Sequence, residues 1–318
     1  MNFTQTITDL KLRDKKWQFI TVAHPEYLVA VAIVDLKFGA HVFLSCVDLK
    51  TREQLMHFSA MAVPGLQVKV KAEPGDGAHA SWKSLNLLDP QKSHIEFTGT
   101  GENYDLAISL PLFAFEMKAH FTPGVPAAPT LDVKADVSSE VFGKPFSGSI
   151  HTQKKNLMKV DGEMNLSGRS VDLSSAFAGI DYTCGLFPRV TRWHWGFALG
   201  QVGGKQIGFN LSIGNNIGDA NENALWWRGK LHMLKPATFD FNPCELHAPW
   251  KVKTEDGAID LVFQAFGVHQ ERRRFGVVES DFVQISGAFS GVLKNPETGD
   301  TLVVEELPGF CEDQNVKW

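Results

Sequence analysis

The spacing of apolar residues along the sequence restricts the possible folds of this chain more than any other feature does. Short runs that alternate polar and apolar residues, or are apolar throughout, are separated by Gly, Pro, Asn and Asp. No apolar stripe with the 3.6-residue period of a helix persists for three turns. The run Leu28–Asp35 is apolar on both faces, which predicts a central strand covered on each side. The pattern therefore predicts an all-β fold with little helix.

The chain is long enough for one large or two medium domains, with 318 residues of which 43% are hydrophobic. The last elements of the first half are expected to be a strand pair over Phe146–Met164 and a loop with one helical turn over Ser170–Gly179. The strand-and-turn pattern then resumes at Arg189. We therefore expect two packed antiparallel barrels or sandwiches, over residues 1–165 and 166–318.

Charge and hydropathy exclude several classes of protein. The 31 Lys and Arg residues against 36 Asp and Glu give a net charge of −5, without the basic stripe that nucleic-acid binding needs. The longest apolar run, Tyr27–Val34, is far shorter than the roughly 20 residues of a transmembrane helix. The N-terminus lacks the apolar segment of a secretory signal, so we expect a cytoplasmic protein.

Common metal and cofactor motifs are missing. No two of the 11 histidines lie within five residues of each other, so the sequence does not predict a zinc site. It has no G-K-[ST] phosphate loop and no G-x-S-x-G nucleophile elbow. The four cysteines are far apart and are expected to be free thiols. We therefore expect neither a metal nor a cofactor.

Unusual residues are concentrated between Asp181 and His232, a segment with four of the eight tryptophans. In a strand over Arg189–Leu199, Trp193, Trp195 and Phe197 share one face and His194 lies on the other. In a strand over Lys205–Ile213, the apolar positions 207, 209, 211 and 213 face away from Asn210, which is expected among polar neighbours. One strand face is thus broad and aromatic.

Candidate site residues come from this segment. The candidate acid–base groups are Asp181, His194 and Glu222, and the candidate ligand contacts are Arg189, Trp193, Trp195, Asn210, Asn223, Trp226 and His232.

Most of these candidates also have a purely structural interpretation. Trp193 and Trp195 are equally well explained as core anchors, and His194 is better explained as a histidine satisfied within the structure. Asp181 and Arg189 suit a buried ion pair, and Glu222 and Asn223 suit a turn cap. The pair Glu312-Asp313 is expected to be a solvated chain end.

The ordered set of motifs resembles a bacterial family known as domain of unknown function 2804. The motifs are the stretch Lys15–Asp35, Asp181-Tyr182-Thr183, Arg189-x-Thr191-x-Trp193-x-Trp195, Gly208-x-Asn210, Glu222-Asn223-Ala224-x-Trp226 and Gly309-Phe310-x-Glu312-Asp313.

The resemblance covers nearly the whole chain. It extends more distantly to tandem calycin-like proteins, which include carotenoid 1,2-hydratases, the AttH group and fungal Diels–Alder cyclases. It implies two lipocalin-like units that hold an apolar ligand in or between them. Gln314 stands where many relatives are expected to have histidine, which weakens an acid–base role for this terminus.

Three functions follow as hypotheses. The first is an enzyme that hydrates, isomerises or cyclises a lipid- or isoprenoid-like molecule without a cofactor, using a carboxylic acid in an apolar wall and tryptophan faces that stabilise a carbocation. The second is a non-catalytic carrier of a hydrophobic molecule, in which Arg189 pairs with a carboxylate head group. The third is a carbohydrate-active protein, which the mainly aromatic face disfavours. The sequence leaves the oligomeric state open.

Overall fold

The computed structural model describes residues 13–71, 73–141, 144–214, 220–275 and 278–317. Strands dominate, and the helical element of this part of the chain is a single 3-10 turn, η1 (Pro111–Phe113), which confirms the all-β fold. No helix in the described ranges is long and apolar enough to cross a bilayer. The expectation about a secretory signal concerns residues 1–12, which lie outside the described residues.

The first sheet is antiparallel and has 13 strands. Its main path runs in the order β4-β3-β2-β1-β13-β11-β9-β8-β7-β6-β5, and β10 and β12 both pair with β11. The strands are β1 (Asp14–Ala23), β2 (Tyr27–Asp35), β3 (Ala40–Asp48), β4 (Glu53–Ala62), β5 (Val68–Lys71), β6 (His79–Lys83), β7 (His94–Thr100), β8 (Asn103–Leu110), β9 (Phe115–Thr122), β10 (Leu131–Val141), β11 (Lys144–Leu166), β12 (Arg169–Asp172) and β13 (Phe177–Leu186).

The second sheet is also antiparallel and has nine strands, in the order β17-β16-β15-β14-β22-β21-β20-β19-β18. The strands are β14 (Val190–Val202), β15 (Lys205–Ile213), β16 (Ala224–Trp227), β17 (Lys230–Met233), β18 (Ala237–Asp240), β19 (Trp250–Thr254), β20 (Ile259–Phe275), β21 (Val278–Lys294) and β22 (Thr301–Lys317).

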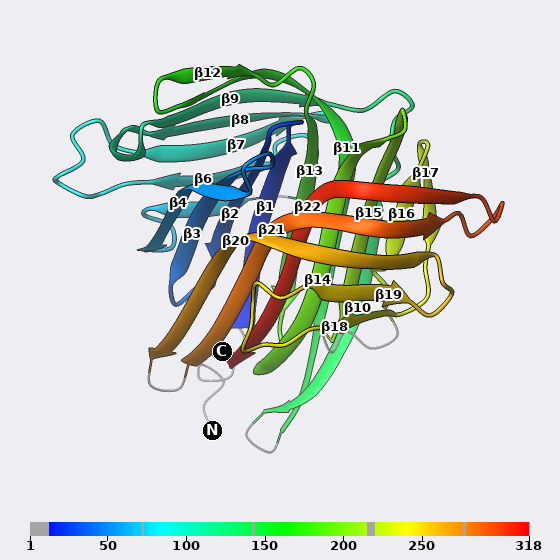
Figure 1. Cartoon of the computed structure of the whole chain (residues 1–318). Coiled ribbons are helices and arrows are strands. Elements are labelled where there is room, and N and C mark those ends of the chain that lie inside the picture. The colour runs from blue at the N-terminus through cyan, green and yellow to red at the C-terminus, as the bar shows by residue number, and fades with distance from the viewer. Residues whose placement is uncertain (1–12, 72, 142–143, 215–219, 276–277, 318) are drawn as a thin grey trace.

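Each sheet curls around an apolar core of its own (Figure 1). Phe97, Phe115 and Phe121, all fully buried, fill the first sheet. Trp250 and Phe263 do the same in the second. Period-2 alternation explains this arrangement, because every second side chain along a strand points to the concave face. Apolar side chains therefore pack the inside of both curled sheets.

A third core joins the two sheets, and we call it the interface core. It includes Phe19 and Leu28 from the first sheet and Trp195, Phe197 and Phe310 from the second. Strand β2 contributes alternate residues to the first core and to the interface core, so both of its faces are covered. The prediction that Leu28–Asp35 forms a central, doubly covered strand is confirmed.

The chain passes from the first sheet to the second between β13 and β14, in residues 187–189. Strand β13 belongs to the first sheet because it pairs with β1 along ten residue pairs and with β11 on its other side. The division of the chain into units over residues 1–165 and 166–318 stays a prediction.

Two local predictions are wrong. The expected strand pair over Phe146–Met164 is one continuous strand, β11, whose pairing with β13 shifts between Lys155 and Met158. The expected loop with a helical turn over Ser170–Gly179 instead contains most of β12 and the start of β13. Both segments carry polar residues because parts of these strands are exposed, so their composition resembles that of a turn.

Candidate functional site

A pocket of about 170 Å³ lies where the two sheets meet, and it is partly open to solvent. Its lining comes from both sheets: Trp17, Phe19, Ala32, Val34, Leu36, Phe38, His41, Phe43, Met61, Ile150, Lys154, Asp181, Thr183, Phe187, Trp193, Trp195, Ser212, Glu222, Glu271, Arg273, Val278, Ser280, Phe282, Gln284, Glu312, Gln314 and Val316. Most of this lining is apolar, with polar groups gathered in two places. An engineered cavity of roughly 150 Å³ holds benzene, so a small apolar group fits here.

Aromatic side chains form one wall. Trp17 and Trp193 are stacked with their ring centroids 6.0 Å apart, and Phe19 meets Trp195 edge to face at 5.3 Å. The period-2 prediction for Arg189–Leu199 is confirmed, because Trp193, Trp195 and Phe197 all contact the interface core. The rings present flat π surfaces that favour contact with apolar or cationic groups.

The first polar group is a buried lysine between two carboxylates. Lys154 Nζ, from β11, lies 2.5 Å from Asp181 Oδ2 and 3.7 Å from Glu222 Oε2. Burial raises the pKa of Glu222, while the ammonium of Lys154 acts in the opposite direction. One cation cannot neutralise two carboxylates, so the cluster favours a proton on Glu222.

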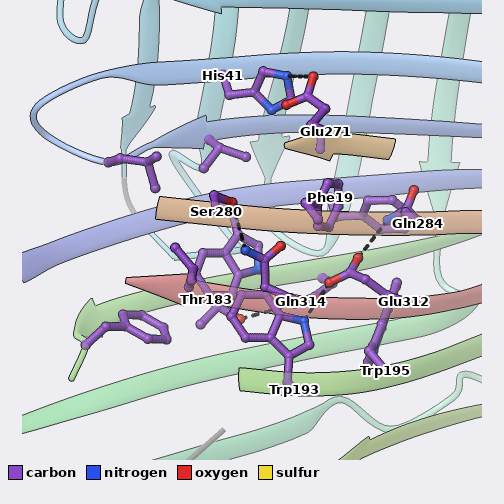
Figure 2. A pocket seen from close by; sticks show the side chains of 18 of the residues that line it. Phe19, His41, Thr183, Trp193, Trp195, Glu271, Ser280, Gln284, Glu312 and Gln314 are labelled. Atoms are coloured by element: carbon purple, nitrogen blue, oxygen red, sulfur yellow. Dashed lines mark hydrogen bonds and ion pairs between the residues drawn. The ribbon is translucent and has the colours of Figure 1, made fainter. Parts of the chain in front are cut away.

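Glu312 lies on β22 in the same pocket (Figure 2). Trp193 Nε1 donates to its Oε1 at 2.6 Å, and Gln284 Nε2 donates to its Oε2 at 2.9 Å. Burial nevertheless raises the pKa of Glu312 to about 7, because the two hydrogen bonds only partly offset the loss of hydration. Such a carboxyl group is poised to donate or accept a proton near neutral pH.

Asn210 and Asn223 lie behind the pocket wall and hold its residues in place. Trp195 Nε1 donates to Asn210 Oδ1 at 2.8 Å, and Asn210 Nδ2 donates to the backbone oxygen of Glu222 at 2.8 Å. Asn223 Oδ1 accepts a hydrogen bond from the backbone N–H of Ser212. Asn210 is therefore fully buried against a tryptophan, whereas the sequence analysis expected it among polar neighbours.

The second polar group lies at another part of the pocket, between β3 and β20. His41 Nε2 is 2.9 Å from Glu271 Oε1, and Arg273 holds Glu271 Oε2 with two nitrogens, at 2.7 and 2.8 Å. Burial opposes ionisation of Glu271, but the hydrogen bonds from His41, Ser59 and Arg273 bring its pKa well below the usual range. The Glu271 side chain is therefore an ionised carboxylate.

His269, on β20, lies behind this second group. Its ring is 2% exposed and stacks on Phe43 with a centroid distance of 4.4 Å. Burial lowers the pKa of His269 to about 3, so the imidazole is neutral. His57 Nε2 lies 2.5 Å from Nδ1 of the same ring.

The structure brings together only part of the predicted site. Asp181, Glu222, Trp193 and Trp195 line the pocket, and Asn210 and Asn223 support it from behind. The remaining four candidates are outside the pocket lining: Arg189, His194, Trp226 and His232.

Other contacts account for the positions of these four residues. His194 is on the opposite face of β14, near Asp313 and Phe241. Trp226 is fully buried and donates to the backbone oxygen of Pro129. His232 Nδ1 lies 3.5 Å from Glu297, and the partly buried Arg189 is in the turn before β14.

Lys154, Gln284 and Glu312 were missed as site residues. The expectation that Glu312 is a solvated chain end is wrong, because β22 runs to Lys317 and Glu312 is only 7% exposed. The sequence did contain a sign that Glu312 is buried. In a strand, Glu312 lies on the same face as the apolar residues Phe310 and Val316. His41 and Glu271 carried no such signal, because they are distant in sequence and meet only where the sheets pack.

The two-sheet architecture is shared with proteins of known structure. CghA superposes with a TM-score of 0.52 at 10% identity, over 96% of this chain and 88% of that chain, and CghA with Sch210972 gives 0.51 over the same shares at 10% identity. Kievitone hydratase from Nectria haematococca gives a TM-score of 0.46 at 12% identity, again over 96% and 88%. The two CghA superpositions show that this chain shares their overall fold.

The chain belongs to the family described as domain of unknown function DUF2804, whose model matches residues 2–318. The family resemblance of the sequence motifs is thereby confirmed. No curated protein matches the chain.

Proposed function

We propose that the pocket between the sheets binds a small, largely apolar molecule and that Glu312 transfers a proton to it. One observation carries this proposal: a carboxyl group with a pKa of about 7 lies in an aromatic wall, held there by Trp193 and Gln284. An acid of this strength protonates an alkene or enol more readily than a solvated glutamate ionised at pH 7 does. Acid-catalysed hydration, isomerisation and cyclisation of an alkene begin with such a step.

The surroundings of Glu312 suit the charge that this step creates. When the carboxyl proton passes to an alkene carbon, a carbocation forms and Glu312 becomes a carboxylate. The π surface of Trp193, which lines the pocket beside Glu312, stabilises the cation. Water or an internal nucleophile then forms the new bond, or loss of a proton gives an isomer, and the released proton returns to Glu312.

The carrier function with an anionic head group has less support. It requires a cation that is free to bind the ligand. The two cations in the pocket lining already face carboxylates, Lys154 with Asp181 and Arg273 with Glu271. Arg189, the expected anchor, is outside the lining. The polar contacts therefore favour a neutral ligand.

Deuterium incorporation tests the proposal. Isoprenoid and unsaturated fatty substrates would be incubated with the protein in D₂O and analysed by mass spectrometry. We expect a product with deuterium at carbon, formed at least tenfold more slowly by Glu312→Gln. The matched control is Glu305→Gln, an exposed carboxylate on the same strand. Unchanged lipid that stays bound would favour a carrier instead.

A further inference from the structure

Two histidines and a glutamate converge where the sheets meet. His41 belongs to β3 of the first sheet, and His269 and Glu271 belong to β20 of the second. One ligand atom from each lies within 4.8 Å of the other two. His41 Nε2 is 2.9 Å from Glu271 Oε1, and His269 Nε2 is 3.7 Å from the same oxygen. Donors around one ion bound at about 2.1 Å are separated by similar distances.

The clearest sign of a ligand is the orphaned nitrogen of His269. Its Nε2 is buried and has no hydrogen-bond partner, although buried polar atoms are nearly always satisfied. Its Nδ1 lies 2.5 Å from His57 Nε2. If Nδ1 carries the proton and donates it to His57, the lone pair of Nε2 points to the space between the three side chains. Metal-binding histidines commonly have such a partner on the second nitrogen.

The two oxygens of Glu271 have different partners, and only Oε1 faces the other two candidate ligands. Arg273 binds Oε2 through Nε and one terminal nitrogen. Oε1 faces His41 and Ser59, whose hydroxyl donates to it. A bound ion would replace these hydrogen bonds to Oε1, while Arg273 keeps the carboxylate anchored through Oε2, as in a typical monodentate metal ligand. The hydroxyl of Ser59 also lies 3.0 Å from His41 Nε2, so it borders the same space.

We propose that His41 Nε2, His269 Nε2 and Glu271 Oε1 bind one divalent transition-metal ion. Two imidazoles and one carboxylate suit zinc and similar first-row ions better than calcium or magnesium, which prefer oxygen donors. His41 and Glu271 line the pocket, so the remaining coordination positions of the ion face it. This inference goes beyond the proposed function and does not depend on it, because Glu312 and the lysine cluster form a separate polar group.

Zinc binding tests the inference directly. The full chain, treated with a chelator and dialysed, would be titrated with ZnCl₂ in a calorimeter and analysed for metal content. We expect one zinc per chain. His41→Gln and Glu271→Gln should each lower the affinity at least tenfold, and His57→Gln should lower it roughly 10- to 100-fold through His269. His232→Gln is the matched control, because His232 is also buried with an unpartnered Nε2 but is not part of the group His41, His269 and Glu271.

The wild-type chain alone provides a second measurement, which does not depend on the folding of variants. A crystal soaked in ZnCl₂ should give an anomalous peak at the zinc edge within bonding distance of all three ligand atoms. The inference is overturned if the peak is absent, or if the His41 and Glu271 variants bind zinc as tightly as the His232 variant does. The three side chains would then serve only to connect the two sheets by hydrogen bonds. Neither result bears on proton transfer by Glu312, which is measured separately.

Discussion

Among single residues, the buried carboxyl groups decide the proposed chemistry of the pocket. Glu312 and Glu222 both have raised pKa values because burial removes their hydration. Sequence patterns identified Glu222 but not Glu312. A pattern shows which face a strand residue occupies, and it cannot show that a residue near the end of the chain is covered by the other sheet.

Glu312 should make stability depend on pH. Its folded pKa is raised from 4.5 to about 7, so between these values the unfolded chain has lost a proton that the folded chain keeps. The free energy of unfolding therefore falls as pH rises from about 4.5 to about 7, by about 3 kcal/mol from this group.

Glu312→Gln should remove this loss of stability, because a neutral amide has no proton to release. Gln284 can rotate its own amide to pair with the new side chain. Urea unfolding at pH 5 and pH 8 checks this. From pH 5 to pH 8, the free energy of unfolding of the wild type should fall by about 3 kcal/mol more than that of the variant. An equal pH dependence in both proteins would contradict the raised pKa.

Lys154 should be important for folding. Lys154→Met leaves Asp181 and Glu222 buried without a cation, which typically costs about 3–5 kcal/mol. The double variant Lys154→Met with Asp181→Asn should recover part of this loss, because it also removes a buried charge. Denaturant unfolding of the single and double variants measures the difference. Equal stability of the two variants would show that the lysine does not compensate Asp181.

At the scale of elements, strand identity was more predictable than strand boundaries. The alternation in β14 and the doubly apolar run of β2 are strong periodic signals, and both were interpreted correctly. The bounds of β11, β12 and β13 were predicted wrongly, because the exposed polar residues in β11 and β12 resemble those of turns. The order of strands in a sheet depends on long-range pairing, as between β1 and β13, which local sequence does not encode.

Gly179, on β13, allows the two sheets to approach closely. A Cβ at this position would lie 2.7 Å from the ring of Phe197, on β14 of the other sheet. Gly179→Ala should therefore destabilise the protein by about 1–3 kcal/mol through overpacking. Gly39→Ala is the control, because its nearest contact would be 3.7 Å away at the flexible end of Met61. Thermal unfolding of both variants checks this, and equal midpoints would argue against tight packing at this crossing.

At the scale of the whole molecule, the pocket exists because two sheets meet. The sequence predicted two β units and an aromatic strand face, and the structure places the pocket between the units. Residues such as His41 and Glu271 come together only through this packing. Local spacing rules for metal ligands were therefore unable to find their cluster.

The pocket between the two sheets is proposed to bind an apolar molecule. The most direct measurement is native mass spectrometry of the protein purified from its own host, with extraction and identification of bound molecules. Two matched variants accompany it: Val34→Trp, which fills the pocket, and Val303→Trp, on the exposed side of β22. We expect one apolar molecule per chain in wild type and Val303→Trp, and at least tenfold less in Val34→Trp. An equal amount in both folded variants would contradict it.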